Sequence, residues 1–174
     1  MNLNKLFLLI LLIVTLIVLC KTKKTKTLKV GDTAPDFDLI DENNKTHSLS
    51  EFKNKKVVLY FYPKDRTKNC TLEACQLRDA FDIYKQNEII IIGISYDSPK
   101  SHKKFKDENA LPFILLSDSK KKVAKLYGAQ NNLLGDIYPD RKTILIGKDG
   151  KIIQIFENVD VKTHSDKILK AFNI

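Results

Sequence analysis

The apolar positions of this chain fall into short blocks separated by polar and charged segments. The blocks predict strands over residues 57–62, 88–95, 113–116, 142–147 and 151–156. The first two blocks are almost continuously apolar, which is typical of strands buried on both faces of a sheet. The last two are joined by Lys148-Asp149-Gly150, and an Asp-Gly turn between apolar runs predicts a hairpin. An extended stretch over 34–40, broken by Pro35, precedes all of them.

Helical spacing follows each of the first three predicted strands. After the first strand, one amphipathic helix is predicted from positions that recur at steps of four and three: Cys70, Ala74, Leu77, Phe81 and Tyr84. Further helices are predicted over 98–109, 119–127 and 161–172, and a short helical turn over 49–52. Ser98 is the expected N-cap of the helix over 98–109, with Pro99 at its first position. Strands alternating with helices, followed by a hairpin and a helix, predict an α/β fold.

Cys70 is predicted in the first turn of a helix that starts just beyond a buried strand. In an open α/β sheet, ligands and chemistry collect at that edge. The unpaired N–H groups and the positive end of the helix dipole favour a thiolate over a thiol, and a nearby guanidinium would add to this. The alternative interpretation is a buried cysteine that packs as a small apolar side chain.

The residues around Cys70 carry a resemblance to a known family. Pro63, Thr67 and Cys70 match the P-x-x-x-T-x-x-C motif of the peroxiredoxins, which are thiol peroxidases. The longer string FYPKD-x-T-x-x-C-T-x-E-A-C is similar to the bacterioferritin-comigratory-protein or PrxQ branch, in which a second cysteine follows five residues after the first. The similarity extends from about Gly31 to the C-terminus. It implies a thioredoxin-like fold with a mixed central sheet flanked by helices.

The resemblance also implies roles for individual residues. Cys70 would be the peroxidatic cysteine and Cys75 the resolving one. Thr67 and Arg141 would hold the peroxide and stabilise the thiolate, and Pro63 would shield it from bulk water. Without the resemblance, Thr67 is also explained as a helix N-cap and Arg141 as a surface cation before a strand.

The implied substrates are hydrogen peroxide and alkyl hydroperoxides. The sulfenic acid formed on Cys70 would condense with Cys75 to a disulfide. Thioredoxin or glutaredoxin would then reduce that disulfide, and no metal, haem or flavin cofactor is required because the thiols carry the electrons. The resemblance favours a monomer, since both cysteines lie in one chain.

Helix geometry sets a condition on this cycle. In a regular helix the Cα atoms of Cys70 and Cys75 lie roughly 8 to 9 Å apart, whereas disulfides rarely tolerate more than about 7 Å. The first turns of the helix are therefore predicted to unwind in each cycle. A structure with the helix intact should contain two separate thiols.

Other polar residues near the motif receive simpler interpretations. Lys64, Asp65, Arg66 and Lys68 are expected to form a solvated loop surface. Glu73 matches the Glu of the family string, and as a first-turn acid it also complements the helix dipole. The three histidines are His47, His102 and His164. They stand in separate polar contexts, and none has a spacing that indicates catalysis or metal binding.

The chain begins with a hydrophobic segment, residues 1–20, whose apolar run covers 6–20. Fifteen helical residues span roughly 22 Å, short of the roughly 30 Å hydrocarbon layer, and flanking lysines and local thinning would absorb the difference. A helical membrane anchor over residues 3–20 is the preferred interpretation. A cleaved signal peptide of similar length is the alternative, and the lack of a small-x-small cleavage site before Cys20 counts against it. Cys20 is interpreted as an inert thiol, with palmitoylation as the alternative.

A Lys/Thr-rich linker over 21–30 separates this segment from the peroxiredoxin-like domain over 31–174. Five lysines of the linker contribute to the formal net charge of +9, so the basic excess is concentrated beside the predicted anchor and gives little reason to expect nucleic-acid binding. Lysines after the anchor favour the cytoplasmic side of the membrane, while an extracytoplasmic or secreted domain stays open.

Two other functions remain as alternatives. The first is a membrane-tethered metal carrier of the copper-delivery type, which also combines an anchored thioredoxin fold with two cysteines and a distant histidine. The CxxxxC spacing and the context of His164 count against it. The second is a redox-regulated docking module without peroxidase turnover, which an inert Cys70 would support.

Overall fold

The computed structural model describes residues 27–131 and 136–174. The strands are β1 (Asp38–Asp41), β2 (Thr46–Ser48), β3 (Lys56–Phe61), β4 (Ile89–Ser95), β5 (Ile114–Ser117), β6 (Lys142–Ile146) and β7 (Ile152–Phe156). The helices are α2 (Lys68–Asp79), α3 (Phe81–Gln86), α4 (Pro99–Asn109), α5 (Lys122–Leu126) and α6 (His164–Ala171), with a 3-10 turn, η1, over Leu49–Phe52. The five strands expected from the sequence are therefore all present, and helix forms in each of the four expected regions, although α5 is shorter than its prediction.

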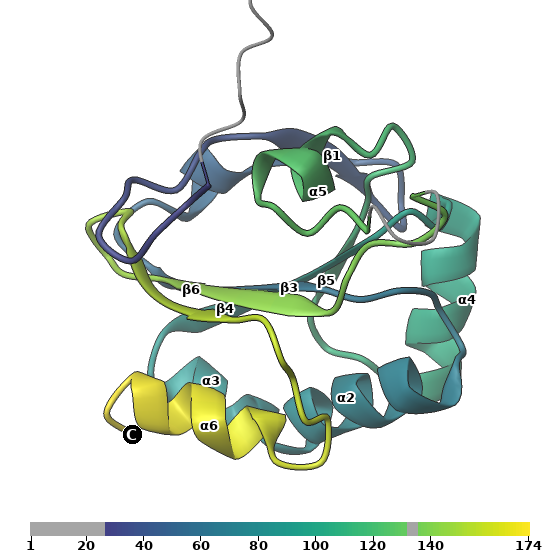
Figure 1. The fold of residues 1–174 in the computed structure, drawn as a ribbon. Helices are drawn as coiled ribbons and strands as arrows, with labels where there is room; N and C mark the ends of the chain where they lie inside the picture. The colour runs from purple at the N-terminus through teal and green to yellow at the C-terminus, as the bar shows by residue number, and fades with distance from the viewer. Residues whose placement is uncertain (1–26, 132–135) are drawn as a thin grey trace, which may run out of the picture.

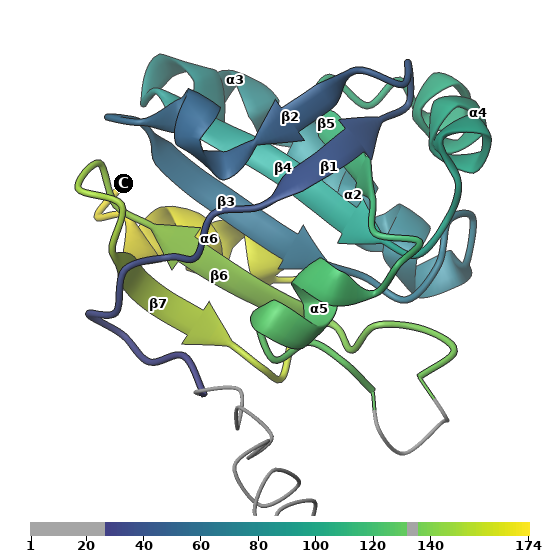
Figure 2. The same ribbon diagram turned by 90° about the horizontal axis from the view of Figure 1, so that it is seen from above.

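One mixed sheet organises these elements, in the order β2-β1-β5-β4-β3-β6-β7 (Figure 2). The central strands β5, β4 and β3 run parallel to one another, whereas β6 and β7 form the predicted antiparallel hairpin beside β3. The hairpin of β1 and β2 pairs with the other side of β5. β2 lies in the polar segment 41–48, which carries no apolar block that would predict a strand.

The sheet separates two apolar cores. In Figure 1, α2, α3 and α6 lie below the central strands, and α5 lies above them. The lower core joins side chains of β3, such as Val58 and Tyr60, to Leu77, Phe105 and Ile168 from the helices. The upper core packs the alternate positions of β3 against α5 and the N-terminal stretch. Strands buried on both faces explain why the sequence blocks over 57–62 and 88–95 are continuously apolar.

The helix that carries Cys70 differs from its prediction, because it is broken. α2 ends at Asp79 and α3 begins at Phe81, with Ala80 at φ −95° and ψ 7° between them. The break lets α3 follow its own direction beneath the sheet, where the Tyr84 hydroxyl lies 3.1 Å from the backbone oxygen of Ser165 on α6. The apolar periodicity continues through the break, so the sequence alone predicted a single helix.

The N-cap of α4 is as predicted. Ser98 accepts a hydrogen bond from the Ser101 N–H at 3.3 Å, and Pro99 is the first helical residue. The helix ends at Asn109, where Ala110 takes a left-handed conformation with φ 50°. The predicted anchor over 3–20, most of the linker and Cys20 lie outside the described residues. Within the described ranges, no helix is long and apolar enough to cross a bilayer.

Candidate active site

Cys70 lies in the first turn of α2, directly after the loop that leaves β3. Thr67 is the N-cap, with extended backbone angles, and its carbonyl accepts the Thr71 N–H at 2.9 Å. The N–H groups of Lys68, Asn69 and Cys70 therefore precede the first bond of the helix and have no partner within it. The thiol is 2% exposed and joins the lower core. A buried sulfur at a helix N-terminus meets the positive end of the helix dipole.

Arg141 reaches Cys70 from the start of β6. Because β6 runs antiparallel to β3, with Lys142 opposite Phe61, the residue before β6 lies beside the loop that leads from β3 into α2. The Arg141 Nη2 donates to the Cys70 sulfur at 3.2 Å. Burial opposes the guanidinium charge, yet Glu73 and Cys70 hold the pKa of Arg141 above its ordinary value. The predicted pairing of Cys70 with Arg141 is thus present, and Arg141 is not a free surface cation.

Glu73 binds the other terminal nitrogen of the Arg141 guanidinium. Its carboxylate accepts a hydrogen bond from Arg141 Nη1 and is fully buried, one helical turn after Cys70. Burial raises the pKa of Glu73 to about 7, although the Arg141 cation acts in the opposite direction. The sequence could not distinguish this role from that of an acid complementing the helix dipole. In the structure Glu73 orients Arg141, and the one guanidinium binds both the Glu73 carboxylate and the Cys70 sulfur.

His164 completes the buried polar group from α6. Its Nε2 lies 2.8 Å from the Thr143 hydroxyl on β6 and 3.9 Å from Glu73 Oε1. The ring also packs edge to face against Phe156, at 5.3 Å between centroids. Burial first, and then the charges of Lys167 and Arg141, lower the pKa of His164 to about 4. The sequence placed His164 in a polar context, whereas its ring is buried and neutral near pH 7.

The other two residues implied by the motif lie in the loop before α2. Thr67 is exposed, and its hydroxyl donates to the Lys64 carbonyl at 3.0 Å instead of forming a side-chain cap. Pro63 is half-buried directly after β3. The loop therefore carries Pro63 and Thr67 beside Cys70, and their actions on a peroxide remain predictions.

Cys75 lies on the same helix as Cys70. Both thiols are free, and α2 is continuous through them, as predicted for the helix-intact state. Cys75 is half-buried and its thiol lies 3.9 Å from Asn109 Oδ1 at the end of α4. Arg78 donates to the Asn109 carbonyl at 2.8 Å. The C-terminal half of α2 is thus held against the end of α4.

Asp65 was expected in a solvated loop surface, and that expectation is wrong. Its side chain is 4% exposed and bonds to Tyr62, Ser101 and His102. The histidine lies 37 residues further along the chain, on α4, and is also fully buried. Local sequence gave no signal of this contact, because Lys64 and Arg66 on either side of Asp65 are exposed.

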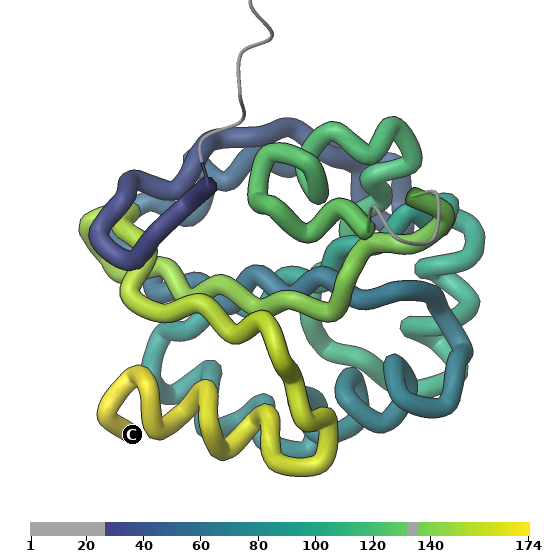
Figure 3. Tube along the Cα trace, in the orientation of Figure 1, coloured from purple at the N-terminus to yellow at the C-terminus, as the bar shows by residue number. Residues whose placement is uncertain are grey.

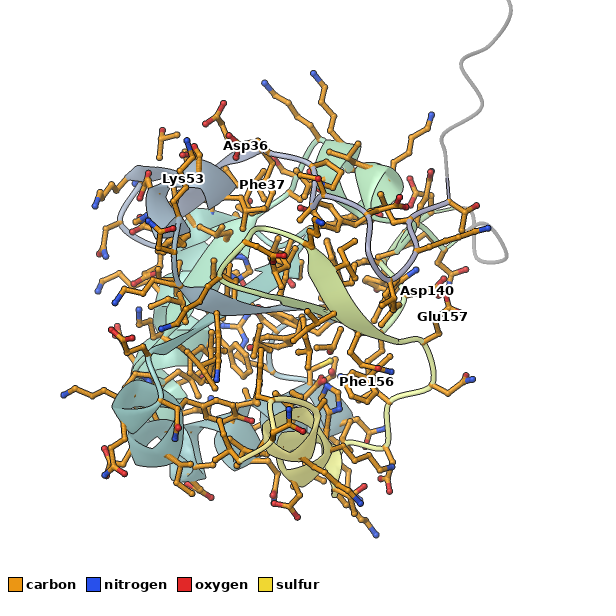
Figure 4. The ribbon with its side chains drawn as sticks, turned by 90° about the vertical axis from the view of Figure 1, so that its left-hand side faces the viewer. Asp36, Phe37, Lys53, Asp140, Phe156 and Glu157 are labelled. Atoms are coloured by element: carbon orange, nitrogen blue, oxygen red, sulfur yellow. The ribbon has the colours of Figure 1, made fainter. Side chains whose placement is uncertain are left out.

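A pocket of about 790 Å³ lies beside Arg141, but neither cysteine lines it. It is lined by residues before and within β6 and by residues after β7, among them Asp140, Lys142 and Glu157. Figure 4 shows Asp140 and Glu157 close together at this side of the sheet, with Phe156 nearby. Lys142 lies 3.2 Å from Glu157 and 3.2 Å from the Gly128 carbonyl. The side chains around this pocket are therefore mostly polar and charged.

Metal binding is not supported by the described part of the chain. Over residues 27–131 and 136–174, no three His, Cys, Asp or Glu side chains are grouped so that they could hold an ion. His164 faces Thr143 and Glu73, and the structure gives it no contact with either thiol.

Comparisons with known proteins agree with the geometry. The sequence model described as the AhpC/TSA family matches residues 30–155. The chain is 40% identical over 149 residues to peroxiredoxin Bcp of Bacillus subtilis, across 83% of this chain and 95% of that protein. It is 43% identical over 141 residues to the chloroplastic peroxiredoxin Q of Populus jackii, across 80% of this chain and 66% of that protein. The chain thus spans about two thirds of the length of that chloroplastic relative.

Solved structures show the same fold. The crystal structure of peroxidoxin BcpB from Mycobacterium tuberculosis aligns with a TM-score of 0.78 and 34% identity, over 84% of this chain and 97% of that one. A cysteine-to-serine mutant of PrxQ from Xylella fastidiosa aligns with a TM-score of 0.79 and 28% identity, over 85% of this chain and 97% of that one. The predicted thioredoxin-like α/β fold with a mixed sheet is confirmed.

Proposed function

Because this chain belongs to the AhpC/TSA family, in its peroxiredoxin Q/Bcp branch, it is a thiol-dependent peroxidase, and we propose that Cys70 is the residue that attacks the peroxide. The observation that carries the assignment is the 3.2 Å contact between Arg141 Nη2 and the Cys70 sulfur. An arginine at the sulfur and a helix N-terminus are both surroundings in which cysteines act as nucleophiles. The copper-carrier and docking-module alternatives are not favoured by these relatives.

In the first step the Cys70 thiolate attacks the terminal oxygen of the hydroperoxide. The O–O bond breaks, Cys70 becomes a sulfenic acid, and the departing alkoxide or hydroxide takes up a proton to leave as alcohol or water. Negative charge grows on the leaving oxygen, so fixed donors near it lower the barrier. Arg141 and the N–H groups of the first turn of α2 are the donors that we assign to this task. The Thr67 hydroxyl joins them when it turns away from the Lys64 carbonyl, to which it donates in the structure. Pro63 limits the access of water to the thiolate.

In the second step the Cys75 sulfur attacks the sulfur of the sulfenic acid. A disulfide forms and hydroxide leaves as water after protonation. Since both cysteines lie in α2, the start of the helix unwinds so that their Cα atoms come within disulfide distance. The contacts of Arg78 and Cys75 with Asn109 hold the remainder of the helix in place. The second step therefore needs no cysteine from another subunit.

Hydrogen peroxide and small alkyl hydroperoxides are the proposed substrates. The solved structures of the bacterioferritin comigratory protein of Xanthomonas campestris concern alkyl peroxide reduction by that protein, and it aligns here with a TM-score of 0.74 and 27% identity. Thioredoxin or glutaredoxin is the proposed reductant of the Cys70–Cys75 disulfide, because a disulfide in an unwound helix start would be strained or exposed, and such disulfides are easily reduced.

Peroxide consumption by the purified full chain, with thioredoxin and thioredoxin reductase as electron donors, tests this function. We expect turnover by the wild type, none by Cys70→Ser, and a single turnover followed by arrest for Cys75→Ser. Glutaredoxin with glutathione replaces thioredoxin in a parallel assay. No peroxide loss with either donor contradicts the proposal, and stoichiometric copper binding by the reduced protein would then support the carrier alternative.

We also propose that the N-terminal segment over 3–20 anchors the enzyme in a membrane. Its apolar run and the lysines that follow it support this, and the lysines favour the cytoplasmic side. Membrane fractions washed with alkaline carbonate should retain the full chain and release a chain lacking residues 1–29. Release of both forms contradicts the anchor.

A monomer is the proposed oligomeric state of the domain. The position of both cysteines on α2 supports it, since the catalytic cycle then requires one chain. Sedimentation of the chain lacking residues 1–29, in reduced and oxidised forms, should give the mass of one copy. A dimer mass in either form contradicts this assignment.

A further inference from the structure

Asp65 is a buried acid inside an exposed loop. The loop joins β3 to α2, and Lys64, Arg66 and Thr67 are exposed within it, whereas Asp65 is 4% exposed. Arg66 has a left-handed backbone with φ 59°, which turns the chain between the buried Asp65 and the exposed Thr67. Such a conformation costs energy in a non-glycine residue and persists where surrounding contacts determine it. The contacts of Asp65 meet that condition.

The Asp65 carboxylate accepts hydrogen bonds from three side chains. The Tyr62 hydroxyl donates to Oδ1 at 2.8 Å, and the Ser101 hydroxyl donates to Oδ2 at 2.7 Å. His102 Nδ1 lies 3.2 Å from Oδ1 and 3.1 Å from Oδ2. Burial opposes ionisation, yet these hydrogen bonds, with that of His102 the largest, hold the pKa of Asp65 below its ordinary value. Asp65 is thus a fully bonded carboxylate.

The backbone of the loop is fixed at the same point. The Asp65 N–H donates to Asp97 Oδ2 at 2.9 Å, and Asp97 also accepts from the Ser95 hydroxyl at 2.8 Å. Ser95 ends β4, and Ser101 and His102 belong to the first turns of α4. Asp65 therefore ties the loop to the end of β4 and to the start of α4. Figure 3 follows the chain from β3 into α2 along this side of the molecule, next to α4.

Asp65 is the fixed point closest to Cys70 along the incoming chain. Between them lie Arg66, Thr67, Lys68 and Asn69, which are all exposed. Five extended residues span at most about 17 Å, so Cys70 can move when α2 unwinds while Asp65 stays bound. At the other end, Arg78 and Asn109 hold the rest of α2 to the end of α4. The segment that must unwind is therefore bounded on both sides by contacts with one helix.

From these contacts we propose that Asp65 is a positioning residue, which fixes the loop bearing Pro63 and Thr67 beside Cys70 while the thiolate attacks the peroxide. The proposal rests on the proposed function of Cys70. The loop must be in place for the first step, because donors act only at fixed distances from the developing charge. In the second step the start of α2 has already unwound, so the rate of disulfide formation does not depend on Asp65.

Rapid mixing with hydrogen peroxide, followed by acid quench, alkylation and mass spectrometry, measures the two steps separately. The first step is the appearance of Cys70 sulfenic acid in a Cys75→Ser background. The second is the conversion of sulfenic acid to disulfide in the chain with both cysteines. Asp65→Asn should slow the first step at least tenfold and leave the second within twofold. Ser101→Ala removes one bond to the same carboxylate and should slow the first step by a smaller factor, about threefold.

Asp41→Asn is the matched control. Asp41 is also buried and bonds to a histidine, with His47 Nε2 3.1 Å from its Oδ2, but this pair belongs to the β1–β2 hairpin. Asp41→Asn should leave both rates within twofold of wild type. If the loss of any buried Asp–His pair slowed the reaction, Asp41→Asn and Asp65→Asn would both slow the first step.

The proposal is overturned if a folded Asp65→Asn variant performs the first step within twofold of wild type, or if both steps slow by the same factor. If Asp65→Asn does not fold, Ser101→Ala decides: an unchanged first step, or equal slowing of both steps, overturns the proposal. The Cys75→Ser chain with Asp65 intact separates a failure of the proposed function from a failure of the positioning role. Absence of Cys70 sulfenic acid in the Cys75→Ser background contradicts the proposed function itself, whereas its normal formation in Asp65→Asn contradicts only the positioning role.

Discussion

The guanidinium of Arg141 lies 3.2 Å from the sulfur of Cys70, although 71 residues separate them in the chain. The antiparallel pairing of β3 with β6 produces this contact, because the start of β6 lies beside the end of β3. The second arm of the same guanidinium binds Glu73, one turn along α2. Arg141 is therefore oriented by a buried carboxylate while it serves the reactive thiol.

Replacing Arg141 should expose its contribution to the first step. Arg141→Lys keeps a positive charge but loses the planar two-armed geometry that reaches Cys70 and Glu73 together. We expect the rate of Cys70 oxidation to fall roughly tenfold to a hundredfold, and further for Arg141→Gln. The measurement is the second-order rate constant with hydrogen peroxide. Lys122→Gln, a change on α5, is the control and should have no effect; equal rates for Arg141→Gln and wild type would refute the role.

Formation of the disulfide should be accompanied by loss of helix. The two cysteines cannot bond within an intact α2, so one equivalent of peroxide should reduce the helical circular dichroism signal of the wild type. Hydrogen exchange should become faster at residues 68–75 and stay slow in α4. Cys75→Ser treated in the same way should keep its spectrum, because its sulfenic acid has no partner. An oxidised wild type with an undiminished helical signal is inconsistent with unwinding.

The buried Glu73 and His164 should give opposite dependences of stability on pH. Glu73 has its pKa raised to about 7, so the folded state binds more protons than the unfolded state above about pH 4.5, and stability falls as the pH rises to 7. His164 has its pKa lowered to about 4, so the folded state binds fewer protons below about pH 6.5, and stability rises as the pH rises from 4 to 6.5. Each effect amounts to about 3 kcal/mol at most, since each pKa moves by roughly 2.5 units.

These two effects largely cancel in the wild type, and single substitutions should separate them. Glu73→Gln should leave a free energy of unfolding that increases from pH 4 to 6.5, and His164→Gln one that decreases from pH 4.5 to 7. Urea unfolding at half-unit pH intervals measures both slopes. Parallel pH profiles for the two variants would show that these side chains do not titrate as described.

Gly93 on β4 lies opposite Tyr60 on β3, and its substitution should destabilise the fold. A Cβ at this position would meet the Tyr60 ring and hydroxyl at 2.7 Å and Leu115 at 2.8 Å, all in the packed core. Gly93→Ala should therefore cost about 1 to 3 kcal/mol in the free energy of unfolding. Gly147→Ala is the comparison, because its nearest neighbour is the Asp149 carboxylate at 2.9 Å, which can swing away. We expect a cost below about 1 kcal/mol there, and equal costs would argue against tight packing around Gly93.

The sequence was most informative where a local pattern determines the structure. The apolar runs around Val58 and Ile91 predicted strands buried on both faces, and the serine cap with Pro99 predicted the start of α4. The break at Ala80 was not predictable, because Phe81 and Tyr84 continue the helical spacing of α2. Packing of Tyr84 on α6 is a tertiary contact that periodicity does not reveal.

In the candidate site, too, the residues with a local sequence pattern were predicted and those held by tertiary contacts were not. Its cysteines, Thr67 and Arg141 were identified through the resemblance of a short motif and its surroundings. The supporting residues were not identified, because their partners are distant in sequence. Asp65 is bound by a histidine 37 residues away, and the polar neighbours of His164 come from α2 and β6. A buried charge among exposed lysines and arginines has no signal in a single sequence.

The most direct test of the account follows one turnover of the fully reduced chain with one equivalent of hydrogen peroxide. Samples quenched over time, alkylated and digested report the state of Cys70 and Cys75 by mass. We predict that sulfenic acid appears first on Cys70 and is then replaced by a Cys70–Cys75 disulfide within the same chain. Oxidation that begins at Cys75, or peroxide that disappears while Cys70 remains a free thiol, would contradict the central assignment.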